Sequence, residues 1–130
     1  MTFNSIIPEL TVSNINQTKE FYIFKLGFNL EYERTDDKFF FATFEESQFM
    51  FEELHNDGWN TGALEYPFGR GVNFSICCNN IDKLYERIMK HQIKPYRKLH
   101  KATYLCGEKV EQQKQFLIQD PDGYLLRFTD

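Results

Sequence analysis

The sequence predicts an α+β fold in which two βαβββ modules form one curved, cup-like mixed sheet. The first observation is a repeat, because the order strand, helix and three strands occurs twice within 130 residues. The halves align at an offset near 66, which places Val12 on Cys78 and Tyr22 on Ile88. The second observation is a hydrophobic content of 42%, which supplies enough apolar surface for a packed core.

This length predicts a single domain covering residues 1–130. Its modules cover about 1–56 and 70–130, and a loop at 57–69 joins them. Neither module can bury its sheet alone, so we expect them to pack side by side. The concave side of the resulting sheet is the natural place for a pocket.

The first module begins with a strand at 6–12, where Pro8 predicts a sheet edge because proline cannot donate to a ladder. A helix is expected over about 16–26, capped by Asn14 or Asn16 and ended by Gly27. Strands at 28–34, 38–44 and 48–54 follow, separated by short polar segments typical of hairpins. One helix face carries Ile15, Thr18, Phe21 and Tyr22.

The connection over 55–70 combines glycine and proline with aromatic residues, which predicts an irregular segment that covers something. The second module then has a strand at 72–78, a helix at about 80–91 and strands at 94–105, 109–119 and 124–129. The last two strands are joined by Asp120-Pro121-Asp122-Gly123, which is typical of a tight turn. The apolar face of the second helix carries Ile81, Leu84, Tyr85 and Ile88.

Charge and composition argue against several classes of partner. A net charge of −4 with scattered basic residues argues against nucleic acid. No apolar run approaches the roughly 20 residues that span a bilayer, and the start of the sequence lacks a secretory signal pattern, so we expect a cytoplasmic protein without a membrane partner. Three cysteines do not suggest a disulfide framework or a zinc site.

Two motifs at opposite ends of the chain carry a family resemblance. The first is Ile7-Pro8-Glu9-Leu10-Thr11-Val12 with Phe21-Tyr22 and Leu26-Gly27-Phe28, and the second is Asp120-Pro-Asp-Gly-Tyr-Leu-Leu-Arg-Phe128. Together they resemble the vicinal oxygen chelate superfamily, which includes the glyoxalase and bleomycin resistance proteins. The resemblance implies the paired βαβββ fold and a homodimer with paired or exchanged modules.

The resemblance also bears on metal binding. In metal-dependent members four ligands project into the cup, and here those positions fall on Ile7, Glu52, Asn73 and Arg127. Only Glu52 has a suitable side chain, whereas Lewis-acid chemistry needs about three His, Cys or carboxylate ligands. We therefore expect no metal and no other cofactor, as in the bleomycin resistance branch.

Strand alternation predicts which side chains face the cup if Ile7 does. The predicted ligand-binding residues are Glu9, Thr11, Met50, Glu52, Trp59, Phe68, Asn73, Ser75 and Arg127. Glu52 and Arg127 should lie close enough for a charge-assisted hydrogen bond. A structural ion pair in an unused cup is the competing interpretation.

Aromatic residues of the connection, three histidines and one cysteine are further candidates for a functional role. Trp59, Tyr66 and Phe68 either stack on a planar or cationic ligand or fill the dimer interface. The three histidines are interpreted as surface residues, and Cys77 has no base nearby in the sequence to make it a nucleophile.

We therefore predict a non-catalytic protein that sequesters an antibiotic, such as a bleomycin-like drug, or a similar small ligand in a cup at a homodimer interface. The alternative is a glyoxalase-superfamily enzyme, of lyase or dioxygenase type, with a non-standard site.

Overall fold

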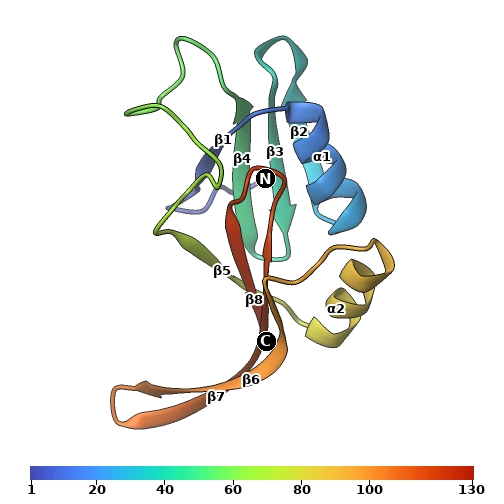
Figure 1. Cartoon of the computed structure of the whole chain (residues 1–130), viewed down its shortest axis with the longest axis vertical. Helices are drawn as coiled ribbons and strands as arrows, with labels where there is room; N and C mark the ends of the chain where they lie inside the picture. The colour runs from blue at the N-terminus through green and yellow to red at the C-terminus, as the bar shows by residue number, and fades with distance from the viewer.

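The computed structural model describes residues 1–130 and confirms the two βαβββ modules (Figure 1). Module 1 consists of β1 (Glu9–Val12), α1 (Ile15–Lys19), the π-helix η1 (Glu20–Lys25), β2 (Asn29–Arg34), the 3₁₀ turn η2 (Thr35–Asp37), β3 (Phe39–Phe44) and β4 (Ser47–Glu53). Module 2 consists of β5 (Asn73–Cys77), α2 (Ile81–Lys90), β6 (Arg97–Cys106), β7 (Lys109–Gln119) and β8 (Leu125–Thr129).

The strands form two separate four-stranded sheets. Sheet A has the order β1-β4-β3-β2 and sheet B the order β5-β8-β7-β6, with the first pair of each parallel and the others antiparallel. The prediction of one continuous sheet is therefore wrong, because β1 and β5 are edge strands with no ladder between them. Pro8 precedes β1 at this edge, as its missing N–H predicts.

The first helix differs from the prediction in its form. It begins at Ile15, with the Asn14 side chain accepting from the Gln17 amide, and changes to a π-helix at Glu20. The wider turn is closed by a bond from the Leu26 amide to the Phe21 carbonyl. A π turn adds a residue to the helical repeat. All four residues of the predicted apolar face are buried, namely Ile15, Thr18, Phe21 and Tyr22.

One hydrophobic core joins the two modules. Alternation correctly assigned its sheet side, since Leu10, Ile76 and Leu126 are buried. Aromatic contacts cross between the modules, with ring centroids of Phe44 and Phe128 5.6 Å apart. Helices α1 and α2 lie on the same side of the molecule (Figure 1). The two helices therefore cover the apolar faces of both sheets from the same side.

The predicted turn at 120–123 fastens module 2 to module 1. Tyr22 Oη donates to Asp120 Oδ2 at 2.8 Å, and the Ser13 amide donates to Asp122 Oδ2 at 3.0 Å. Gly123 has φ of +97°, and a Cβ there would lie 2.5 Å from Cβ of Pro67, so only glycine fits. Burial raises the pKa of Asp120 to about 6, although hydrogen bonds from Tyr22 and two backbone amides oppose the shift.

Two segments extend away from this core over part of their length. The connection over 54–72 contains no helix or strand, as predicted. The β6 and β7 hairpin projects away from the rest of the chain (Figure 1), with Leu105 and Val110 exposed near its tip. No helix in the structure has the length and apolar character needed to cross a bilayer.

Candidate functional site

The candidate site lies on the side of sheet A opposite the core, which we call face A. Strand register arranges its side chains in two rows that cross the sheet. One row is Tyr32, Phe41, Met50 and Glu9, and the next is Arg34, Phe39, Glu52 and Thr11. The rows therefore place three aromatic rings and Arg34 on β2 and β3, and the carboxylates Glu9 and Glu52 on β1 and β4.

A cavity of about 580 Å³ opens at the end of face A. It is bounded by the strand ends, by η2 and by the start of the connection. Its walls carry six carboxylates against one arginine and one lysine, so the cavity is strongly acidic. The lining residues are Glu9, Arg34, Asp36, Asp37, Lys38, Glu52, Glu53, Leu54, His55, Asp57 and Trp59.

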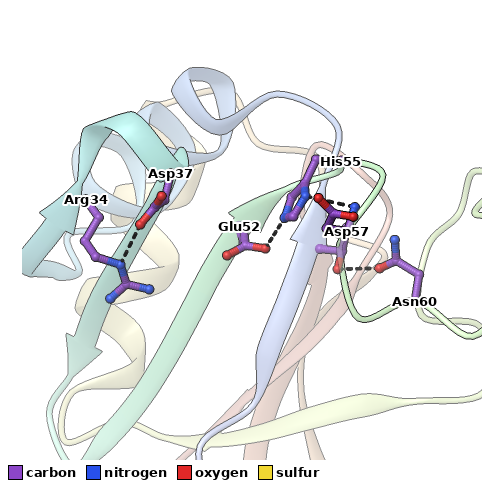
Figure 2. Close-up of polar contacts among 7 residues, drawn as sticks. Arg34, Asp37, Glu52, His55, Asp57 and Asn60 are labelled. Carbon is purple, nitrogen blue, oxygen red and sulfur yellow. Dashed lines mark hydrogen bonds and ion pairs between the residues drawn. The ribbon is translucent and has the colours of Figure 1, made fainter.

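Glu52 is held in the cavity by a neighbouring histidine. Its Oε1 lies 2.6 Å from His55 Nε2, while the Asp57 amide donates to His55 Nδ1 at 3.2 Å (Figure 2). With Nδ1 facing that amide, Nε2 is the ring nitrogen that faces the Glu52 carboxylate and can donate to it. Glu52 therefore has a hydrogen-bond partner beside it but no ion pair with an arginine or lysine.

A second carboxylate reinforces this negative charge. Partial burial raises the pKa of Glu9, and the charge of Glu52 raises it further, whereas Arg34 opposes the shift. Two other acids are neutralised, since Asp37 binds Arg34 at 3.1 Å and Glu53 binds Lys38 at 2.9 Å. The other four carboxylates of the cavity form no ion pair with an arginine or lysine, so the cavity keeps a net negative charge.

The aromatic floor already supports a planar cation from the protein itself. The Arg34 guanidinium carbon lies 3.8 Å from the centroid of the Phe39 ring, a cation–π geometry. Beside it, Tyr32 stacks on Phe41 with centroids 5.2 Å apart and an interplanar angle of 10°. Phe3, from the N-terminal arm, meets Phe41 edge-to-face at 5.5 Å. Phe39 and Phe41 are consequently buried although they face the cup.

The structure brings five of the predicted ligand-binding residues to this region. Glu9, Glu52 and Trp59 line the cavity, and Trp59 is 94% exposed. Met50 lies in the first row of face A, and Thr11 lies in the second. Thr11 Oγ1 donates to Asn60 Oδ1 at 2.8 Å, which ties the connection to β1 (Figure 2).

The other four predicted residues lie elsewhere. Asn73, Ser75 and Arg127 belong to sheet B, and the expected ion pair between Glu52 and Arg127 does not form within the chain. Strand alternation correctly identifies the side of the sheet on which each residue lies. It does not show that Glu52 and Arg127 belong to two separate sheets. Phe68 packs edge-to-face on Tyr124 at 5.9 Å instead of lining the cavity, because the connection folds back onto the 120–123 turn.

Several cavity residues escaped the sequence analysis. Asp36 and Asp37 were assigned only to a hairpin, and His55 was interpreted as a surface histidine. Their approach to Glu52 depends on how η2 and the connection fold over the strand ends. One local signal existed, because Glu52 and His55 are three residues apart at the end of a strand.

The donor set does not fit a catalytic metal. No group of three or more His, Cys, Asp or Glu side chains is arranged to hold an ion. The positions that correspond to superfamily ligands other than Glu52 carry an isoleucine, an amide and a guanidinium, namely Ile7, Asn73 and Arg127. These side chains supply none of the ligands that Lewis-acid chemistry requires.

Comparison with known proteins places these features in context. A family model described as the glyoxalase/bleomycin resistance protein/dioxygenase superfamily matches residues 3–128. Bleomycin resistance proteins of Geobacillus stearothermophilus and Staphylococcus aureus are each 29% identical, over 94% of this chain and 92% of theirs. TioX from Micromonospora sp. ML1 has a TM-score of 0.76 at 12% identity, covering 98% of both chains. A protein of unknown function from Agrobacterium tumefaciens has a TM-score of 0.75 at 22% identity, covering 99% of this chain and 94% of its own. These two structural likenesses concern the fold alone.

Proposed function

Because the chain belongs to the glyoxalase/bleomycin resistance protein/dioxygenase superfamily, we propose that it is a small-molecule-binding protein of the bleomycin resistance type. It binds a cationic ligand with a planar aromatic part and sequesters it without chemical change. The single observation that carries the proposal is the acidic cavity at the end of face A, with the exposed Trp59 ring at its rim.

The charges and rings of face A define what such a ligand must offer. The carboxylates of Glu9 and Glu52, which have no arginine or lysine partner, favour an ammonium or amidinium group, since charge-assisted hydrogen bonds are the strong ones. The Arg34 guanidinium already covers the Phe39 ring, so the aromatic surface open to a planar part of the ligand is Trp59 at the cavity rim. A cavity of about 580 Å³ is within the usual range for drug-sized ligands.

The proposal is for binding and not for catalysis. The superfamily enzymes named as the alternative depend on a metal, and the side chains of Ile7, Asn73 and Arg127 cannot ligate one. His55 keeps Glu52 engaged as a hydrogen-bond acceptor. The sequestering function therefore requires only the charge and shape of the cavity.

We further propose that the protein acts as a homodimer, in which a second copy closes the open side of the cavity. A ligand bound on face A alone would keep one side in water, and Trp59 stands almost fully exposed at the rim. Light scattering at micromolar concentration should give the mass of two chains. A monomeric mass would contradict the dimer.

Ligand binding is tested with cationic heteroaromatic drugs, bleomycin first. A specific ligand should raise the melting temperature by mass action and change the fluorescence of Trp59, the only tryptophan. Mass spectrometry should recover the drug unaltered. Absence of any saturable shift across the drugs, or recovery of a chemically modified drug, would overturn the proposal.

A further inference from the structure

We propose that the chain has a second ligand site, a groove beside α2 that binds an organic anion with an apolar body, such as an aryl sulfonate or aryl carboxylate. We call it the helix groove. It has a volume of about 730 Å³ and lies on the side of the molecule that carries α1 and α2 (Figure 1). Its lining includes Leu26 and Phe44 of module 1, and Lys83, Arg87 and Lys90 of module 2. It shares no residue with the acidic cavity of face A, so the inference is independent of the proposed function.

The floor of the helix groove is apolar. Leu26 and Leu84 are buried there, and Phe44 packs against the hydrophobic core while staying partly accessible. Cys78 lies beside them, and burial raises the pKa of its thiol, so this side chain adds no negative charge. An apolar ligand body that covers this floor leaves water, which favours binding. The volume of the groove is within the usual range for small-molecule sites.

One wall of the helix groove carries positive charge. Lys83, Arg87 and Lys90 are four and three residues apart on α2, so their side chains lie on one side of the helix. None of the three forms an ion pair with a carboxylate. The charges of the two exposed lysines are therefore available to an anion that rests on the apolar floor.

Arg87 also fixes the shape of the groove. Its Nε donates to the Lys25 carbonyl and its Nη2 to the Phe24 carbonyl, both at 2.8 Å, so α2 is held against the end of η1. Gly27 allows this approach, because a Cβ there would lie 3.0 Å from the guanidinium carbon. The two walls of the groove are thus joined within the chain itself. A site built in this way needs little ordering when a ligand binds.

The two carboxylates that line the helix groove do not cancel its positive charge. Glu45 accepts from the Asn79 amide at 3.0 and 3.2 Å, so it is engaged with the backbone just before α2. That amide is already used, and the attraction for an anion comes from the α2 side chains. With Glu86 included, three cationic side chains face two carboxylates, whereas the acidic cavity has six carboxylates against two cations. The groove is positive in a chain whose net charge is −4.

The test uses 8-anilinonaphthalene-1-sulfonate (ANS), an aryl sulfonate whose fluorescence increases when its rings leave water. We expect saturable binding of one ANS molecule per chain. In the double variant Lys83→Gln/Lys90→Gln the dissociation constant should rise about 10-fold, because two charge-assisted contacts are lost. Glu86→Gln removes an opposing charge from the same groove, so the dissociation constant should fall about 3-fold.

The matched control is the double variant Lys98→Gln/Lys109→Gln. It removes the same charge from exposed positions of the hairpin formed by β6 and β7, outside the helix groove. Its dissociation constant for ANS should equal that of the wild type. Circular dichroism checks that every variant is folded.

Nuclear magnetic resonance locates the bound probe. Amide chemical shifts should change at Gly27 and over 83–91, while those of Trp59, at the acidic cavity, stay constant. Four results would overturn the inference: no saturable ANS binding, unchanged affinity in the α2 double variant, an equal loss in the hairpin control, or shift changes centred on Trp59. Because the probe is an anion, failure here leaves the binding of cationic drugs, measured by thermal shift, to be judged separately.

Discussion

Modules 1 and 2 share a topology but differ in the chemistry of their open faces. The ladder positions Thr11 and Glu52 of module 1 correspond to Cys77 and Thr129 of module 2 at the offset of 66 for the first strand. Module 1 thus presents a carboxylate where module 2 presents a hydroxyl. The internal repeat thus preserves the apolar side of each sheet, which packs into one core, while the open side diverges.

The hairpins of the two modules differ as well. In module 1, β2 and β3 are six residues each, and η2 between them forms a wall of the cavity. In module 2, β6 and β7 have 10 and 11 residues, and their far ends extend beyond the core (Figure 1). The acidic cavity is therefore lined by module 1 and the connection, without any residue of module 2.

The largest effect is expected from mutations in the shared core, which test whether the two modules unfold cooperatively. Phe51 is fully buried in module 1 and stacks on Phe40 at 4.6 Å, and Phe128 is fully buried in module 2 and stacks on Phe116 at 5.4 Å. Phe51→Ala and Phe128→Ala should each lower the free energy of unfolding by about 3–5 kcal/mol. Denaturant titration should show one transition for both. Two separate transitions would mean that the modules unfold independently.

A slightly smaller effect should come from the turn that precedes β8. Burial raises the pKa of Asp120 to about 6, so the folded chain holds a proton that the unfolded chain releases near pH 4. This group therefore makes stability fall as pH rises from about 4 to 6, by about 3 kcal/mol for a shift of some two units. Asp120→Asn should remove that part of the pH dependence in denaturant titrations.

The matched control for this experiment is Glu46→Gln, in the exposed turn that precedes β4 of module 1. The difference in unfolding free energy between the wild type and Asp120→Asn is measured at several pH values. A difference that does not vary between pH 4 and 6.5 would show that Asp120 does not titrate in this range.

A moderate effect is expected on ligand binding. Glu52→Gln keeps the size of the side chain but removes its charge, so the affinity for a cationic drug should fall about 10-fold. Glu111→Gln removes the same charge from the exposed β7 strand of module 2 and serves as the control. Titration of Trp59 fluorescence measures both. Equal affinities in the two variants would place the ligand away from face A.

Removal of metal ions is expected to have no effect on stability or on drug binding. A superfamily metal site draws ligands from both modules, and module 2 supplies only Asn73 and Arg127 at those positions. Treatment with a chelator should therefore leave the melting temperature and drug affinity unchanged. Elemental analysis should find no stoichiometric transition metal. Zinc, nickel or iron near one per chain, lost in Glu52→Ala, would contradict this.

The sequence predicted the elements well because their signals are local. Helical spacing identified the buried faces of α1 and α2, and strand alternation identified the core side of β1, β5 and β8. The same alternation could not show that the strands divide into two sheets, because it contains no information on what lies beyond an edge strand. The expected pairing of Glu52 with Arg127 within one chain failed for this reason.

The cavity was harder to predict because it depends on tertiary placement. Glu9 and Glu52 were identified from the strands, whereas Arg34, Asp36 and Asp57 join them only through the folding of η2 and the connection. The π turn in the first helix was also missed, since its backbone widening has no distinctive residue pattern in this segment. Phe68 was misplaced because aromatic content alone does not say which surface a loop covers.

The N-terminal arm has a practical consequence for handling the protein. The Asn4 side chain donates to the Glu46 carbonyl, and the Asn4 backbone N–H donates to the Gln48 side chain. These bonds hold Phe3 against Phe41 on face A. An affinity tag fused ahead of Met1 would emerge beside the ligand-binding surface and compete with added drugs. The other terminus is the safer place for a tag, because Asp130 follows β8 in sheet B, where the Lys114 amide of β7 donates to its side chain.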